Sequence, residues 1–277
     1  MNFILNKLTF IKSIFLKELK INIKIFFFTF IYLFRSSFKK VHLELNNKEK
    51  VLFHNLKKNG FLEYTKYEEH FLERIHEKYF NQEGNLGDNN SSKSFWNNKS
   101  LNREKTIDLS KLIFKNDKTL YKIVSNYFSE PYYLESIELV RSLNLGSKHQ
   151  SSQLFHRDFN SIKTLKVFIY FSDVNSSDDG PFSIITQSLK ARMLSFINPI
   201  HKSLKWEKRV SKFSNVKEFL GKRGKVFIVD TFRNFHFGSR ITNDGSRLML
   251  IVSFRNINRL HGTDPFQPIK LKNIVSN

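Results

Sequence analysis

Beyond residue 149 the chain consists of short apolar runs separated by turn-forming clusters, and this pattern restricts the fold more than any other feature. Four runs of strand length fall at 165–171, 182–186, 225–230 and 248–254, and a turn cluster at 175–180 divides the first two. Only residues 216–220 suggest a helical period. Short strands at regular spacing are typical of sandwiches, jelly rolls and barrels. The sequence therefore predicts that this half is β-rich and forms a sandwich, a jelly roll or a barrel.

The preceding residues are mainly helical in pattern. Helices are expected at 48–58, 67–80 and 118–128, with the Asn-Gly pair at 59–60 ending the first, a loop at 82–99 and a strand at 133–145. We therefore expect one domain over 41–277, with a helical half (41–132) packed on one sheet of a β-rich half (133–260). The sequence does not indicate the oligomeric state.

Residues 1–40 form a basic, apolar amino-terminal extension. The uncharged stretch between Lys24 and Arg35 has ten residues, about half the length that a bilayer span requires, and no convincing signal-peptide cleavage site follows it. Two interpretations remain open for residues 1–34: an amphipathic helix on an anionic membrane, or a helix docked on the core or on a second subunit. We expect a cytoplasmic protein, with membrane association as the open alternative.

The absence of cysteine limits the chemistry. It excludes a disulfide framework, a zinc ribbon, an iron–sulfur cluster and a cysteine nucleophile, so any metal must take His and carboxylate ligands. The net charge of +21 would ordinarily suggest a polyanionic partner. However, only 13 of the 46 basic residues are Arg, no run of five basic residues occurs, and no nucleic-acid-binding motif is present. Nucleic-acid binding is therefore not expected.

One grouping of His and carboxylate residues has ligand spacing. His156 and Asp158 are two positions apart, so on a strand they point to the same side. Such a pair is nearly uninformative alone, but His236 follows the predicted strand at 225–230 and could return beside it on a rolled sheet. Two imidazoles and one carboxylate on one face of a metal leave three positions open, as in non-haem Fe(II) oxygenases. Arg247, at the start of the next strand, could bind a dicarboxylate's far end.

These residues lie in a stretch that resembles the phytanoyl-CoA dioxygenase family. The resemblance rests on segments 155–159, 165–173, 180–182, 224–230 and 236–247, and more weakly on 56–61. It implies a mainly β fold with α-helices, in which the β-rich half (133–260) is a double-stranded β-helix (cupin-like jelly roll), and an enzyme dependent on Fe(II), 2-oxoglutarate and O₂. It further implies that His156, Asp158 and His236 bind the iron, and that Arg247 pairs with the far carboxylate of 2-oxoglutarate.

The resemblance has one clear departure. Where the family commonly reads Pro-Gly-Ser-His after the Gly-Pro turn, this chain has Thr-Gln-Ser-Leu at 186–189, which puts the substrate class in doubt. The expected function is a dioxygenase that hydroxylates an aliphatic C–H bond of a small-molecule or lipid-like substrate. The alternatives are a non-catalytic jelly-roll binding protein or a basic peripheral membrane protein. Arg240 and Arg255 remain alternatives to Arg247, and Asp230 is interpreted as a strand-end cap.

Overall fold

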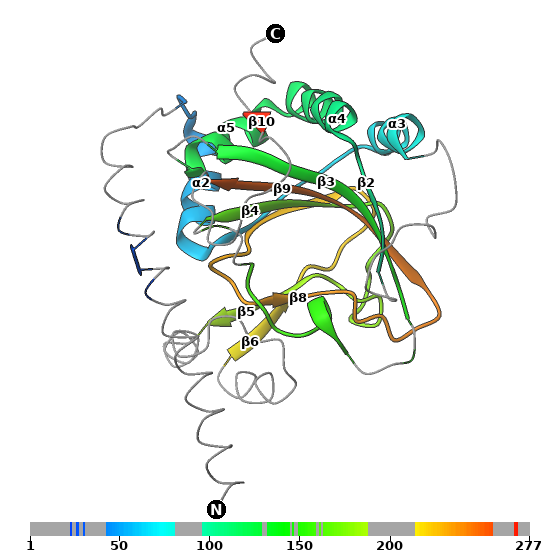
Figure 1. The fold of residues 1–277 in the computed structure, drawn as a ribbon. Helices are drawn as coiled ribbons and strands as arrows, with labels where there is room; N and C mark the ends of the chain where they lie inside the picture. The colour runs from blue at the N-terminus through cyan, green and yellow to red at the C-terminus, as the bar shows by residue number, and fades with distance from the viewer. Residues whose placement is uncertain are drawn as a thin grey trace, which may run out of the picture.

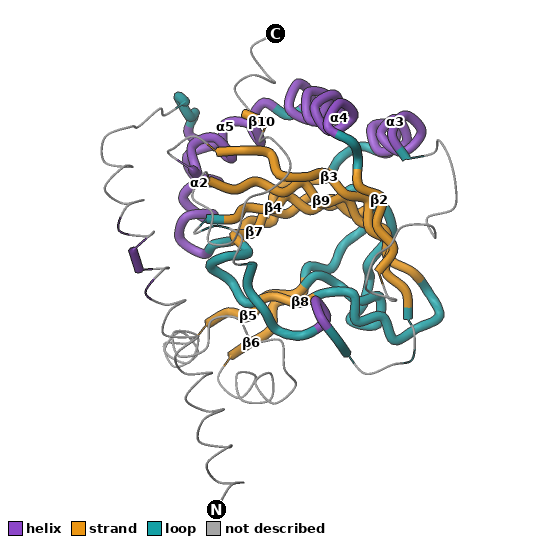
Figure 2. The backbone as a smooth tube through the Cα atoms, viewed as in Figure 1, coloured by secondary structure: helices purple, strands orange, loops and turns teal. Residues whose placement is uncertain are grey.

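The computed structural model describes residues 43–80, 96–128, 132–144, 146, 149–158, 161, 163–187, 214–256 and 269–270, together with residues 23, 26, 27 and 30. Two antiparallel sheets face each other (Figure 1, Figure 2). The large sheet has the strand order β1-β7-β4-β9-β3-β10, and β2 also pairs with β3. The small sheet has the order β6-β5-β8.

The strands of the large sheet are β1 (Phe61–Lys66), β2 (Trp96–Ser100), β3 (Tyr132–Leu143), β4 (Thr164–Tyr170), β7 (Lys225–Asp230), β9 (Ser246–Asn256) and β10 (Ile269–Lys270). Those of the small sheet are β5 (Ser183–Gln187), β6 (Ser214–Glu218) and β8 (His236–Phe237). A short 3₁₀ turn, η1, spans Ser151–Gln153.

Four helices lie on the side of the large sheet that faces away from the small one (Figure 1). They are α2 (Asn47–Asn59), α3 (Glu69–Tyr79), α4 (Arg103–Asn116) and α5 (Lys118–Phe128). α2 begins at Asn46, whose side chain accepts from the Glu49 amide while Glu49 accepts from the Asn46 amide. It ends at Gly60, which has a φ of 75°, a left-handed conformation that favours glycine.

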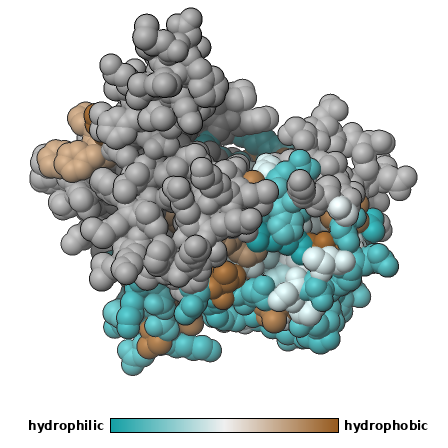
Figure 3. Space-filling model, turned by 90° about the horizontal axis from the view of Figure 1, so that it is seen from below, coloured by the Kyte–Doolittle hydropathy of each residue, from teal (hydrophilic) through white to brown (hydrophobic). Residues whose placement is uncertain are grey.

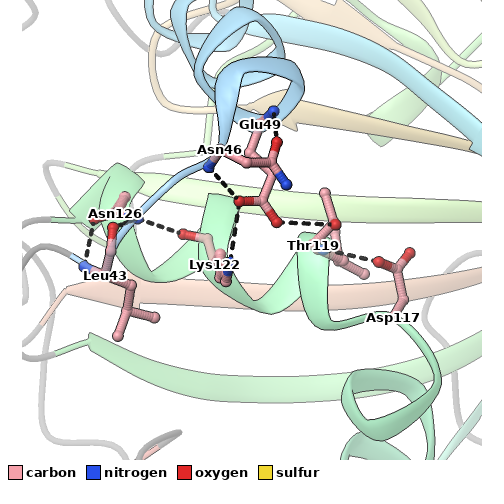
Figure 4. A network of polar contacts seen from close by, with 8 residues as sticks. Leu43, Asn46, Glu49, Asp117, Thr119, Lys122 and Asn126 are labelled. Atoms are coloured by element: carbon pink, nitrogen blue, oxygen red, sulfur yellow. Dashed lines mark hydrogen bonds and ion pairs between the residues drawn. The ribbon is translucent and has the colours of Figure 1, made fainter.

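Glu49 also joins α2 to α5 (Figure 4). Its carboxylate accepts from Thr119 Oγ1 at 3.2 Å and from Lys122 Nζ at 3.1 Å, and its side chain is 5% exposed. The hydrogen bond from the Asn46 amide outweighs the effect of burial and holds the pKa of Glu49 below its ordinary value. The buried carboxylate is thus fully partnered, as a buried charge must be.

The two faces of the large sheet carry separate apolar clusters, because side chains alternate along each strand. On β4, Leu165, Val167 and Ile169 pack with the helices. Phe168 and Tyr170 face the small sheet, where they pack in a second cluster with residues such as Phe227. We call this second face the interior face. It is the face turned toward the small sheet (Figure 1).

The structure confirms the expected fold class. The helices expected at 48–58, 67–80 and 118–128 correspond to α2, α3 and α5, and the predicted strands correspond to β3, β4, β5, β7 and β9. The helical period suggested at 216–220 is wrong, because residues 214–218 form β6. Residues 96–99 of the expected loop belong to β2. β1 and α4 were not predicted.

The amino-terminal extension lies almost wholly outside the described residues. Its four described residues, Ile23, Phe26, Phe27 and Phe30, are helical and exposed. Among the described residues, no helix has both the length and the apolar character needed to cross a membrane.

Candidate metal centre

Two histidines from distant parts of the chain meet through their backbones. The His156 amide donates to the His236 carbonyl at 3.0 Å, and the His236 amide donates back to the His156 carbonyl at 2.9 Å. This antiparallel bridge brings the centres of the two imidazole rings to 4.2 Å. His236 also pairs with Ile184 of β5, and the Phe182 ring stacks on it at 5.3 Å. The small sheet therefore fixes both rings.

Backbone carbonyls set the orientation of both imidazoles. His156 Nδ1 lies 2.8 Å from the Leu154 carbonyl oxygen, and His236 Nδ1 lies 3.1 Å from that of Asn234. Because a carbonyl oxygen can only accept, each Nδ1 carries a hydrogen, so in the neutral form of the ring the lone pair lies on Nε2. This is the tautomer in which an imidazole binds a metal through Nε2.

Asp158 completes the group. Its amide donates to the Thr231 carbonyl at 3.0 Å, and its Oδ2 lies 3.8 Å from His236 Nε2 and 2.8 Å from Lys166 Nζ. One ligand atom from each of His156, Asp158 and His236 lies within 4.8 Å of the other two. The structure thus brings together the three residues that were predicted from sequence.

The carboxylate of Asp158 is ionised at neutral pH. Burial alone would raise its pKa, but the positive charge of the Lys166 ammonium, with that of His236 and His156 when these rings are protonated, outweighs burial and holds the pKa of Asp158 well below its usual range. Two neutral nitrogen donors and one anionic oxygen donor suit a first-row divalent metal. The residues present therefore fit such an ion.

Arg247 lies at the start of β9 and is 1% exposed. Its guanidinium donates from Nη1 to the Gly180 carbonyl, and from Nη2 to Ser239 Oγ at 2.9 Å and Ser142 Oγ at 3.2 Å. Its buried Nε has no hydrogen-bond partner within the described part of the chain. Burial lowers its pKa, but a guanidinium remains charged in proteins.

Gly238, two residues after His236, lies beside this guanidinium. A Cβ added to Gly238 would lie 3.6 Å from Nη1 and 3.7 Å from Nη2 of Arg247. These are ordinary van der Waals distances, so position 238 lies in direct contact range of the guanidinium.

The other candidates have different surroundings. Arg240 donates from Nε to the Gln153 carbonyl at 2.6 Å and lies 3.7 Å from the Phe237 ring centre. Asp230 accepts from the amides of Phe232 and Arg233, which confirms it as a strand-end cap. Burial raises the pKa of Asp230.

The interior face carries polar and charged residues at the end opposite Arg247, which sequence reasoning missed. Lys166 lies opposite Ser253 there, and its side chain is 23% exposed. Arg255 Nη1 lies 3.0 Å from Glu135 Oε1, because a bulge in β3 between Leu134 and Ser136 re-aims Glu135. A lysine within the otherwise apolar run of β4 was the available signal.

Comparisons with known proteins agree on the fold. HygX from Streptomyces hygroscopicus, with nickel and 2-oxoglutarate bound, has a TM-score of 0.55 at 15% identity over 77% of this chain and 88% of that chain. SnoN, a non-heme alpha-ketoglutarate-dependent epimerase from nogalamycin biosynthesis, has a TM-score of 0.54 at 11% identity over 80% and 93%. SnoK, a carbocyclase from the same biosynthesis, has a TM-score of 0.51 at 13% identity over 82% and 97%.

At these identities the similarity establishes a shared fold. No protein-family model matches the sequence, and no curated protein matches it. The chain has the double-stranded β-helix fold of 2-oxoglutarate-dependent oxygenases, with a cluster of two histidines and one aspartate inside it.

Proposed function

We propose that the protein is an Fe(II)- and 2-oxoglutarate-dependent dioxygenase that hydroxylates an aliphatic C–H bond of a small molecule. The observation that carries this proposal is the convergence of His156, Asp158 and His236 inside this fold. When bound, Fe(II) with 2-oxoglutarate and O₂ would supply an oxidant strong enough to attack an unactivated C–H bond, with succinate and CO₂ as co-products. The intact ligand set is the reason to prefer an enzyme over a non-catalytic binding protein.

The chain's own residues would bind, orient and desolvate the reactants. The two histidines and Asp158 would hold the iron from one side and leave the opposite positions open. Arg247 would bind the far carboxylate of 2-oxoglutarate, with its unpartnered Nε as a further donor. The apolar interior face, including Phe168 and Tyr170, would exclude water from the reaction.

The substrate is proposed to be polar. The solved structures include HygX with hygromycin B bound and SnoN in complex with nogalamycin RO, so this fold accommodates small molecules. In this chain the side of the centre away from Arg247 carries Lys166, Glu138, Arg255 and Glu135, whose ionised groups suit a polar ligand better than an acyl chain. This favours the small-molecule interpretation over the lipid-like one.

Metal binding and 2-oxoglutarate turnover test the proposal. Protein prepared without oxygen should bind one Fe(II) per chain and should form succinate slowly from 2-oxoglutarate once O₂ is admitted. His156→Ala and Asp158→Ala should each abolish both iron binding and succinate formation. His54→Ala, on the exposed side of α2, should change neither. Unchanged iron stoichiometry in the first two variants would show that the centre is misassigned.

We also propose that residues 1–34 contact an anionic membrane. Ile23, Phe26, Phe27 and Phe30 have the three- and four-residue spacing of one helix face and are between 57% and 73% exposed. A hydrophobic patch is visible at the left margin of Figure 3. The sequence places Lys20 and Lys24 beside this face. An apolar helix face flanked by lysines fits an anionic lipid surface.

A further inference from the structure

Lys166 is a charged residue at the polar end of the interior face, where it pairs with Ser253 on one side and with apolar Val229 on the other. It alternates with Phe168 and Tyr170 along β4, so all three side chains point to the interior face. Neither a strand edge nor the outer surface explains a lysine there. Its position calls for a partner inside the protein.

That partner is a proposed metal ligand. Lys166 Nζ lies 2.8 Å from Asp158 Oδ2, and this same oxygen lies 3.8 Å from His236 Nε2. Oδ2 is therefore the Asp158 oxygen that faces the histidines. The ammonium holds the atom that a metal bound by the three residues would need.

A counter-ion for Asp158 is required when no metal is bound. A buried carboxylate without a partner strongly destabilises a fold, and no backbone amide donates to this side chain within the described residues. A divalent cation would meet the same need. The two cations cannot both approach one carboxylate oxygen closely without strong mutual repulsion.

We propose that Lys166 is the resident counter-ion of Asp158 and is displaced when the metal binds. This inference rests on the metal centre proposed above. In the metal-free protein the ammonium pairs with the carboxylate and holds it in place. On metal binding it moves away from the three ligands.

Two carboxylates on β3 can receive the displaced ammonium. Ser253 of β9 pairs with Lys166 on one side and with Ser136 of β3 on the other. Glu135 and Glu138 lie before and after Ser136 along β3, so both are near the level of Lys166 in the sheet. Glu138 points to the interior face, because it lies opposite Ile251, a member of the interior cluster. Both carboxylates already stabilise the charged form of Lys166 through space. Lysine's four-carbon stem allows such a movement.

Replacing Lys166 separates this role from a purely structural one. Lys166→Met has similar length and no charge, so it removes the competitor for Oδ2 and also removes the counter-ion. We therefore expect opposite effects: tighter metal binding and lower stability of the metal-free protein. A residue that merely packed would leave metal affinity unchanged, and one that oriented Asp158 for the metal would weaken binding when replaced.

Ni²⁺ serves as a redox-stable probe for the experiment. The full chain is stripped with a chelator, and Ni²⁺ affinity is measured by calorimetry while thermal unfolding is followed with and without Ni²⁺. Lys166→Met should bind Ni²⁺ at least about tenfold more tightly than the unmodified chain, roughly the effect of one ion-pair competitor, and should unfold at a lower temperature without metal. Lys217→Met is the matched control, because Lys217 pairs with Glu63 at 2.6 Å on the edge of the sheets and should leave Ni²⁺ affinity unchanged.

Lys166→Arg keeps the proposal testable if the methionine variant does not fold. A guanidinium can grip both carboxylate oxygens at once, so this variant should bind Ni²⁺ more weakly than the unmodified chain. Equal or weaker binding by Lys166→Met, or tighter binding by Lys166→Arg, would overturn the role of Lys166 alone. Failure of the unmodified chain to bind Ni²⁺ would instead overturn the metal centre itself.

Discussion

Replacing Arg247 by Lys tests how the chain would hold 2-oxoglutarate. The substitution keeps the positive charge but removes the planar fork and the Nε donor. In the structure the two terminal nitrogens are already engaged by Gly180, Ser239 and Ser142. Nε has no hydrogen-bond partner among the described residues, so it is the donor proposed to bind 2-oxoglutarate, and lysine has no equivalent of it.

The expected magnitude follows from losing one charge-assisted hydrogen bond. Such a bond contributes about 1.5–3 kcal/mol, so the dissociation constant for 2-oxoglutarate should rise roughly 10- to 150-fold. Metal binding should persist, because the guanidinium makes no contact with His156, Asp158 or His236 among its hydrogen bonds.

The assay is calorimetric titration of 2-oxoglutarate into Ni²⁺-loaded protein. Arg240→Lys is the control, since Arg240 contacts the Gln153 carbonyl and the Phe237 ring instead, and its 2-oxoglutarate affinity should not change. Thermal unfolding of both variants separates a local effect from loss of the fold. Undiminished 2-oxoglutarate affinity in a folded, metal-binding Arg247→Lys protein would refute the assignment.

Three further predictions concern the rest of the chain. Glu49→Gln should lower the free energy of unfolding by about 2 kcal/mol at pH 7. Because the folded pKa of Glu49 lies below its unfolded value, this difference should hold above about pH 4.3 and vanish as the pH falls through the folded pKa, as denaturant titrations at several pH values would show. Gly60→Ala should destabilise the protein by more than about 1 kcal/mol, because Gly60 has φ +75° and an added Cβ would lie 2.5 Å from Asn234 Nδ2. It should also weaken Ni²⁺ binding, because Asn234 lies two residues before His236. Anionic vesicles should sediment the full chain at low salt but not at high salt, and should not sediment a chain lacking residues 1–40; equal sedimentation of both would contradict membrane contact.

The strands were predictable where burial on both faces leaves a continuous apolar run. β4, β7 and β9 lie in the middle of the large sheet with helices on one side and the small sheet on the other, so each contains a run of consecutive apolar residues. β1 and β6 lie at sheet edges and have short, mixed sequences. Edge strands take their structure from the neighbouring strand, which sequence pattern alone does not reveal.

The metal-ligand residues could be predicted because, on a strand, the number of residues between two positions decides whether their side chains point to the same face. The two-residue interval between His156 and Asp158 directs both to one side in any extended segment. The contact with His236 depended on the roll of the sheet, which the spacing of the strands suggested and the family resemblance supported. The Lys166 contact with Asp158 could not be derived, because it depends on how a residue of β4 lies against the segment that precedes it.

The pairing of β1 with β7 has a consequence for synthesis of the protein. Lys66 pairs with Lys225, so β1 leaves the ribosome about 160 residues before its partner, a wait of roughly 10–30 s at ordinary translation rates. In the described sheet β1 has no other strand neighbour, and its apolar Phe61 and Leu62 remain without their native cover during that interval. A nascent chain with such an unpaired strand is prone to misassociation. The last-made third of the chain thus completes the sheet, and chaperones that shield emerging segments should improve the yield of folded protein.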